Sequence, residues 1–119
     1  MIWYADGSGW NGRRSRYAVV SSTEKYIFET KEEFTNNEME YLGAIRAAEL
    51  AIENSVIATD SALVVNQVSG KFKVRKEHLK KYHKKLKKLC EEKQLELIWV
   101  PRKENEAGKL LERIQGHWL

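Results

Sequence analysis

Three stretches near the N-terminus are rich in β-branched, aromatic and other apolar residues and show no helical period. They cover residues 1–6, 15–22 and 25–30, and turn-forming residues separate them. This pattern predicts three β-strands. Because the connections between them are short, the strands are expected to pair antiparallel.

Two later stretches place apolar residues at helical spacing. The first begins after Thr35, and Glu38 three residues on completes a capping-box signature, so a helix should run to about Glu53. The second spans residues 76–93 and sets one apolar face against a lysine-rich face. The buried face of the first helix is expected to contain Met39, Leu42, Ile45, Ala48 and Ile52.

The rest of the chain alternates short strands and helices. Strands are predicted at 56–59 and 95–100, a short helix at 61–69 and a last helix from about 104 to 115. Since the last two strands follow helices, they should run parallel to the first strand, with helices on both faces of the sheet. The predicted fold class is therefore α/β, with a five-stranded mixed sheet of three antiparallel and then two parallel strands.

Length and composition fit one globular domain over residues 1–119, with a hydrophobic fraction of 42%. No apolar run is long enough to span a bilayer and no signal peptide is recognisable, so no membrane partner is expected. The single cysteine, Cys90, excludes an internal disulfide and a cysteine-rich zinc site. These features favour a cytoplasmic protein, and we expect a monomer.

Positive charge is unevenly distributed. The net charge is +4, and eleven of the 21 Lys and Arg residues lie between Lys71 and Lys93, against three Glu. Such a cluster favours a polyanionic partner. A solvated, lysine-rich helix face would have the same composition, so charge alone does not decide between the two.

Residues 7–12 read "GSGWNG" and fit the pattern G-x-G-x-x-G. A dinucleotide-binding loop requires a helix after the glycines, because the helix N-terminus holds the pyrophosphate. Here a predicted strand follows, which favours a glycine-rich hairpin turn. That interpretation leaves Asp6, directly before the turn, unexplained.

Three carboxylates are expected to converge. Asp6 and Asp60 follow two predicted parallel strands, and Glu40 lies in the first turns of the helix between them. The carboxyl ends of parallel strands meet at one edge of a sheet. Clustered oxygen ligands without His or Cys favour Mg²⁺ or Mn²⁺, and a pair of such ions suits phosphodiester cleavage. Each acid taken alone could equally be a cap or a surface residue.

The chain resembles a type 1 ribonuclease H. The segments that carry the resemblance are "YADGSG" at 4–9, "TNNEMEYLGAIRAAELA" at 35–51, "ATDSALVVNQVSGKF" at 58–72 and "WVPRKENEAGKLL" at 99–111. The resemblance implies a ribonuclease H-like fold. It also implies a metal-dependent endonuclease that cleaves the RNA strand of RNA–DNA hybrids.

The resemblance also assigns roles to single residues. It implies that Asp6, Glu40 and Asp60 are metal ligands, with Asp6 bridging two Mg²⁺ (or Mn²⁺) ions. Asn36 and Asn37 match positions that contact the hybrid in its minor groove, and Gly7 and Ser8 match a turn whose backbone approaches the RNA.

The chain departs from the family pattern at three places. Gly108 stands where a fourth carboxylate is expected, and the loop 101–104 lacks a His that some members have. Residues 70–76 are too few for the basic insertion of longer members. Glu106 is the first choice for a substitute ligand. The lysines expected to bind nucleic acid instead of the insertion are Lys80, Lys81, Lys84 and Lys85.

Two functions remain open at this point. One is a hybrid endonuclease weakened by the missing carboxylate, and the other is a catalytically silent nucleic-acid-binding module that keeps the fold.

Among the aromatic residues, Trp10 lies in a loop beside Asp6 and is placed to stack on a base or sugar. Trp3 and Trp99 lie in predicted strands and are expected in the core.

Overall fold

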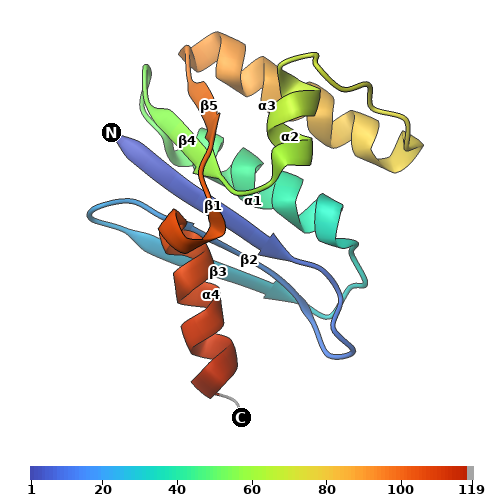
Figure 1. The fold of residues 1–119 in the computed structure, drawn as a ribbon, viewed down its shortest axis with the longest axis vertical. Helices are drawn as coiled ribbons and strands as arrows, with labels where there is room; N and C mark the ends of the chain where they lie inside the picture. The colour runs from blue at the N-terminus through green and yellow to red at the C-terminus, as the bar shows by residue number, and fades with distance from the viewer. Residues whose placement is uncertain (118–119) are drawn as a thin grey trace.

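The structure is a computed structural model that describes residues 1–117, and it describes side chains for residues 1–114. Its helices and strands follow the predicted order (Figure 1). They are β1 (Ile2–Ser8), β2 (Ser15–Val20), β3 (Lys25–Thr30), α1 (Asn36–Leu50), β4 (Val56–Thr59), α2 (Ala62–Val68), α3 (Glu77–Lys93), β5 (Glu96–Trp99), the 3₁₀ turn η1 (Arg102–Glu104) and α4 (Glu106–His117).

The five strands form one mixed sheet in the order β3-β2-β1-β4-β5. The first three strands pair antiparallel, and β4 and β5 run parallel to β1, so the predicted topology is confirmed. In Figure 1, α4 crosses in front of the strands and α1 lies behind them. Helices therefore cover both faces, as right-handed crossovers require. No helix among the described residues is long and apolar enough to cross a membrane.

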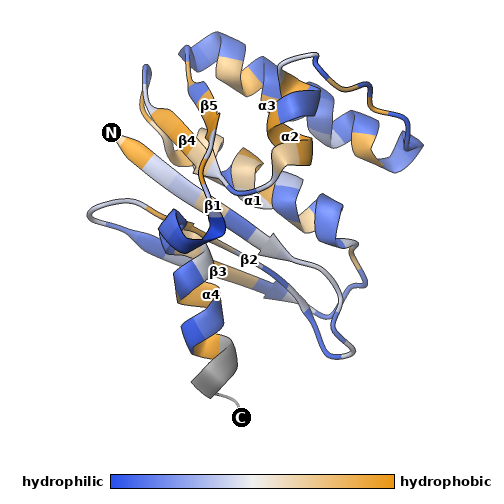
Figure 2. Ribbon diagram, in the orientation of Figure 1, coloured by the Kyte–Doolittle hydropathy of each residue, from blue (hydrophilic) through white to orange (hydrophobic). Residues whose placement is uncertain are grey.

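The larger core lies between the sheet and the layer of α1 and α3. Trp3, Tyr41, Ile57 and Leu86 are fully buried there, and alanines of α1 allow the helix to pack closely on β1. A smaller core lies under α4 around Ala18. Figure 2 shows the corresponding pattern, with hydrophobic residues on the strands and hydrophilic ones over the outer side of α3.

The C-terminal end of α1 is held by a residue from a distant helix. The Lys93 ammonium group donates hydrogen bonds to the carbonyl oxygens of Ala48 (2.9 Å), Glu49 (2.8 Å) and Ala51 (2.9 Å). These carbonyls lack partners within the helix, and a cation at a helix C-terminus is favourable. Lys93 therefore fixes where α1 ends.

Replacing Lys93 with Met should lower the free energy of unfolding by about 1–2 kcal/mol, because the stem is kept and the charged donor is lost. Urea unfolding of the two proteins measures the difference. Lys88→Met is the matched control, since Lys88 is exposed and pairs only loosely with Glu92 (3.8 Å). An equal effect of both substitutions would show that the contacts of Lys93 with α1 add nothing.

Two sequence-based boundaries were wrong. The first helix ends at Leu50 rather than near Glu53, so Ile52 lies beyond it and is 65% exposed instead of buried. The last helix begins at Glu106 rather than 104, because residues 102–104 form a 3₁₀ turn and Asn105 caps the helix. In both cases a side chain that bonds free backbone groups at the helix terminus decides the boundary.

The expectation for Trp99 was also wrong. It is 51% exposed, because β5 is an edge strand and its last residue lies outside the core. Its indole Nε1 donates to the carbonyl oxygen of Asp60 (3.1 Å). Trp3 is buried as expected, and Trp10 lies in the loop after β1 with about a third of its surface exposed.

Candidate functional site

The three predicted carboxylates meet at one edge of the sheet. Asp6 lies in β1, Asp60 directly follows β4, and Glu40 lies in the second turn of α1. Strands β1 and β4 are adjacent and parallel, with Ala5 opposite Thr59, so they bring Asp6 and Asp60 to the same end. One carboxylate oxygen from each residue lies within 4.8 Å of the others.

Close contact between β1 and α1 places Glu40 at this site. A Cβ on Gly7 would lie 2.3 Å from the backbone of Met39, and one on Gly9 would lie 2.4 Å from the backbone nitrogen of Asn36. Only glycine allows such contact. The Gly9 amide donates to Asn36 Oδ1 (2.7 Å), which ties the loop after β1 to the start of α1. Gly7 and Gly9 of the "GSGWNG" segment therefore allow the close packing that positions the acidic site.

One oxygen of each carboxylate lacks a hydrogen-bond donor, although the Gly7 backbone amide donates to Asp6 and to Glu40 and partly lowers their pKa. Asp6 Oδ1, Glu40 Oε2 and Asp60 Oδ2 are buried, and no described residue donates a hydrogen bond to them. Burial, reinforced by the charge of Asp60, raises the pKa of Asp6 to about 7. Burial, reinforced by Asp6 and Asp60, raises the pKa of Glu40 to about 9. Buried anionic oxygens without donors fit a divalent cation with hard ligands, so these residues suit Mg²⁺ or Mn²⁺.

The metal-free protein should lose stability as the pH rises. In the unfolded chain both acids titrate near pH ~4, whereas the folded protein holds the protons of Asp6 and Glu40 to about pH 7 and 9. Above pH ~4 the folded protein therefore binds more protons than the unfolded chain, so the free energy of unfolding falls as the pH rises and levels off once the pH has passed the folded pKa values. Thermal unfolding in EDTA between about pH 5 and pH 9 measures the loss, and Mg²⁺ should restore stability at the alkaline end. A melting temperature unaffected by pH and by Mg²⁺ would contradict the predicted loss of stability.

An ion pair from the C-terminal region lies close to these acids. The charge of Arg102 lowers the pKa of Asp6, against the effect of burial. Arg102 Nε donates to Glu112 Oε1 (3.3 Å), which links η1 to α4 beside the site. The sequence analysis did not identify Arg102, because an exposed arginine in a basic chain gives no local signal.

The start of α4 also borders Asp6. A Cβ on Gly108 would lie 3.3 Å from Asp6 Oδ2, so this position faces the acidic site directly. Asn105 is fully buried and donates to the carbonyl oxygen of Ala5 (2.9 Å), while its Oδ1 accepts from the amides of Ala107 and Gly108. It therefore fastens α4 to β1, a role the sequence analysis missed.

The structure does not bring Glu106 together with the three acids. Its side chain is exposed and lies 3.3 Å from Lys109 Nζ, one turn further along α4. Its carboxylate is not part of the group whose oxygens lie within 4.8 Å. The hypothesis that it replaces a fourth ligand has no support from this arrangement.

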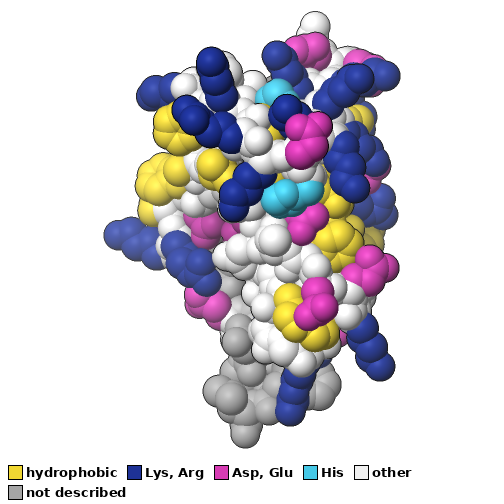
Figure 3. Space-filling model, turned by 90° about the vertical axis from the view of Figure 1, so that its right-hand side faces the viewer, with side chains coloured by type: hydrophobic (Ala, Val, Ile, Leu, Met, Phe, Trp, Pro, Cys, Tyr) yellow, Lys and Arg dark blue, Asp and Glu magenta, His cyan; other side chains and the backbone are white. Residues whose placement is uncertain are grey.

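A basic pocket of about 530 Å³ lies between the start of α1 and the loop 69–76. Asn37 and Gln67 lie on one side of it and Phe72 is exposed. The view in Figure 3 shows Lys and Arg side chains crowded over the upper half of this side of the molecule. The cationic residues that line the pocket are Lys71, Lys73, Arg75 and Lys76.

Three of the four lysines predicted on α3 already have partners. Lys80 pairs with Glu77 (2.9 Å), Lys85 pairs with Glu49 (3.4 Å), and Lys81 lies 5.0 Å from the centre of the Tyr82 ring. Lys84 is exposed. The loop 69–76 thus offers the more open cationic surface, and its alternating basic residues in the sequence could have indicated it.

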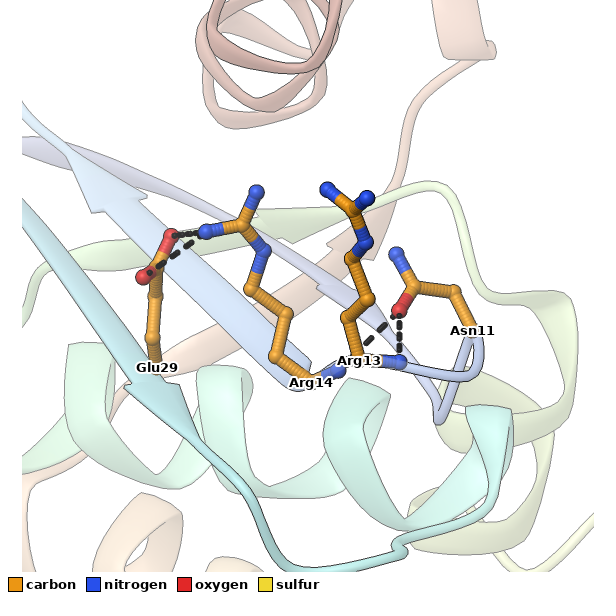
Figure 4. Close-up of polar contacts among 4 residues, drawn as sticks. All are labelled: Asn11, Arg13, Arg14 and Glu29. Carbon is orange, nitrogen blue, oxygen red and sulfur yellow. Dashed lines mark hydrogen bonds and ion pairs between the residues drawn. The ribbon is translucent and has the colours of Figure 1, made fainter. Parts of the chain in front are cut away.

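The turn after β1 presents further arginines. Asn11 Oδ1 accepts from the amides of Arg13 and Arg14, both at 3.0 Å, and Arg14 pairs with Glu29. Figure 4 shows the guanidinium groups of Arg13 and Arg14 extending to the same side of the sheet. The turn therefore adds two arginines to the cationic side chains of the surface.

Comparisons with known proteins agree with this arrangement. A family model described as RNase H matches residues 1–108. LC11-RNase H1, isolated from compost by a metagenomic approach, is 28% identical with a TM-score of 0.79, covering 99% of this chain and 97% of that one. In a second structure LC11-RNase H1 is in complex with an RNA/DNA hybrid (24% identity, TM-score 0.71, 88% of each chain). The N-terminal RNase H domain of a Mycobacterium tuberculosis protein is 24% identical, with a TM-score of 0.76 and 96% of each chain covered.

Proposed function

The chain belongs to the RNase H family, and we propose that it is a metal-dependent endoribonuclease that hydrolyses the RNA strand of RNA–DNA hybrids. One observation carries the proposal. Asp6, Glu40 and Asp60 each bring one carboxylate oxygen within 4.8 Å of the others, and each has a buried oxygen without a donor. The hybrid bound to LC11-RNase H1 supports the choice of substrate.

The residues of the chain have distinct tasks in this proposal. Two divalent cations, when bound, supply the activation of the attacking water and the stabilisation of the leaving oxygen. Asp6 lies in β1, the strand that packs against α1 and pairs with β4, so it is placed to be a shared ligand, with Glu40 and Asp60 as the outer ligands. The contact of Gly7 with α1 keeps these side chains in place before substrate arrives.

Substrate binding is assigned to the surfaces around the acids. Four residues lie where β1 meets α1 and are assigned to the minor groove of the hybrid, where the 2′-hydroxyl groups of the RNA strand are accessible. They are Gly7, Ser8, Asn36 and Asn37. The basic pocket lined by the loop 69–76 extends from Asn37, so it is placed to bind phosphates of the same duplex. Phe72 is exposed within this loop and can stack on a sugar or base.

The test is cleavage of a labelled RNA–DNA hybrid against Mg²⁺ and Mn²⁺ concentration, with duplex RNA and duplex DNA as controls. Cleavage of the RNA strand only, in the presence of metal, supports the proposal. Binding of the hybrid without cleavage in either metal would instead support the silent binding module. The silent binding module is the second candidate because Gly108, which lies next to Asp6, has no carboxylate to bind metal.

Replacing Lys71, Lys73 and Arg75 together with Gln should weaken hybrid binding and flatten its salt dependence. Each phosphate contact contributes about 0.9 to the log–log slope for duplex DNA, so the loss of two or three contacts lowers it by about two to three. The measurement is hybrid affinity against salt concentration in Ca²⁺, which prevents turnover from interfering.

The matched comparison replaces the helix lysines Lys80, Lys81, Lys84 and Lys85 with Gln. Because three of them have partners in the protein, the slope should change less than with the loop variant. An unchanged slope in the loop variant would place the substrate on another surface.

A further inference from the structure

Strand β3 forms an exposed edge of the sheet. It is the first strand in the order β3-β2-β1-β4-β5, and within residues 1–117 it pairs only with β2. Three consecutive large apolar residues lie on it, Tyr26, Ile27 and Phe28, with 43%, 40% and 42% of their surfaces exposed. An edge with unpaired backbone groups and apolar side chains is a template for another strand.

We infer that β3 pairs with β3 of a second copy of this chain, antiparallel and around a twofold axis at Ile27, so that two sheets join into one. In this register Ile27 lies opposite Ile27 of the partner subunit. Tyr26 lies opposite the partner's Phe28, and Lys25 lies opposite the partner's Glu29. The surface is independent of the proposed nuclease activity.

The side chains of β3 complement themselves on both faces in this register. Phe28 stacks on Tyr17 with ring centres 5.0 Å apart, on the side of the sheet that α1 covers, and Tyr26 points to the same side. Lys25, Ile27 and Glu29 point to the other side. Two aromatic pairs therefore form on one face and two opposite-charge pairs on the other, and both kinds of cross-strand pair are stabilising.

Symmetry leaves few alternatives. A twofold axis perpendicular to the sheet requires one residue to lie opposite itself, so neighbouring registers differ by two residues. With Tyr26 on the axis, Lys25 would face Ile27. With Phe28 on the axis, Lys25 would face Lys31, a like charge. Only the register centred on Ile27 sets the charge of Lys25 against that of Glu29, which also pairs with Arg14 of its own chain (3.2 Å).

The proposed pairing leaves the acidic site open. Asp6 lies in β1, and Asp60 directly follows β4. In the sheet, β2 separates both of these strands from the β3 edge. The sequence-based expectation of a monomer rested on no surface feature, whereas the exposed edge of β3 is a specific surface feature that favours a dimer.

The oligomeric state is the first test. Sedimentation of the 119-residue chain should give a species of twice 13.9 kDa, and Ile27→Lys should raise the dissociation constant of that dimer by at least ~10-fold, because two ammonium groups would meet on the axis. Ile52→Lys is the matched control, since Ile52 is exposed away from β3. A monomer at all concentrations, or a dimer equally sensitive to both substitutions, overturns the inference.

The register is the second test. Opposite residues in an antiparallel pair have Cα atoms about 4.5–5.5 Å apart, within the range for a disulfide. Ile27→Cys should crosslink to itself on mild oxidation, whereas Tyr26→Cys should crosslink only when mixed with Phe28→Cys. Cys90 does not compete, because it is buried and burial raises its thiol pKa to about 11. Crosslinking of Tyr26→Cys alone would overturn the proposed register.

Discussion

Replacing Asp6 with Asn should reduce the rate of metal-dependent hybrid cleavage by about 10³-fold and raise the melting temperature of the metal-free protein. Asp6 lies in β1, which packs against α1, the helix of Glu40, and pairs with β4, the strand before Asp60. Loss of one preorganised charged group costs a few kcal/mol of transition-state stabilisation. The same substitution relieves repulsion among buried acids, which costs stability when no cation is bound.

The opposite signs of the two effects make this prediction specific. A substitution that merely unfolds the protein lowers both activity and melting temperature. Glu40→Gln and Asp60→Asn should behave like Asp6→Asn, and all three should reduce the stabilisation by Mg²⁺. Glu92→Gln is the control, because Glu92 is exposed on α3 and its ion pair among the described side chains is with Lys88. Near-parental cleavage rates in all three site variants would show that the proposed site is wrong.

Replacing Gly108 with Asp should increase the cleavage rate at low Mg²⁺ by about 10-fold or more. The new Cβ would lie 3.3 Å from Asp6 Oδ2, so its carboxylate would join the acidic group from α4. The contacting atom belongs to the side chain of Asp6, and this side chain can shift by the few tenths of an ångström that the contact demands. A fourth carboxylate should strengthen metal binding and improve the alignment of the reacting groups, each of which is valuable for catalysis.

Two control variants separate charge from shape at this position. Gly108→Asn has nearly the same volume as Gly108→Asp without the charge, and Gly108→Ala adds the same Cβ contact with Asp6 together with the helix propensity that glycine lacks, about 1 kcal/mol. Neither should raise activity at low Mg²⁺. Without metal, Gly108→Asp should have a lower melting temperature than Gly108→Asn, because it adds a fourth negative charge. Saturating Mg²⁺ should raise the melting temperature of Gly108→Asp more. Calorimetry measures both melting temperatures without any cleavage assay.

Three results would contradict the interpretation of Gly108. If the parent is fully active at low Mg²⁺ and Gly108→Asp changes nothing, another residue supplies the ligand. If Gly108→Asn gives the same gain as Gly108→Asp, the effect comes from packing. If both parent and variant bind hybrid but cleave it in neither Mg²⁺ nor Mn²⁺, the silent binding module is the better description.

Much of the fold followed from the sequence because it depends on local patterns. Runs of β-branched, aromatic and apolar residues predicted the strands, helical spacing predicted the two long helices, and the capping box at Thr35 and Glu38 gave the start of α1 to the residue. The acidic site was also predictable. Asp6 and Asp60 lie near the carboxyl ends of adjacent parallel strands, which the topology brings together, and Glu40 lies near the start of the helix that precedes the second strand.

Other features were decided only by contacts between distant segments. The end of α1, and with it the exposure of Ile52, depends on Lys93, which lies more than 40 residues further along the chain. Asn105 reaches Ala5 across 100 residues and fixes α4 beside Asp6. Trp99 is exposed because its strand is at an edge. A residue's own sequence neighbours determine its backbone preference, but its burial and partners depend on which segments pack against it, and that is settled only when the whole chain folds.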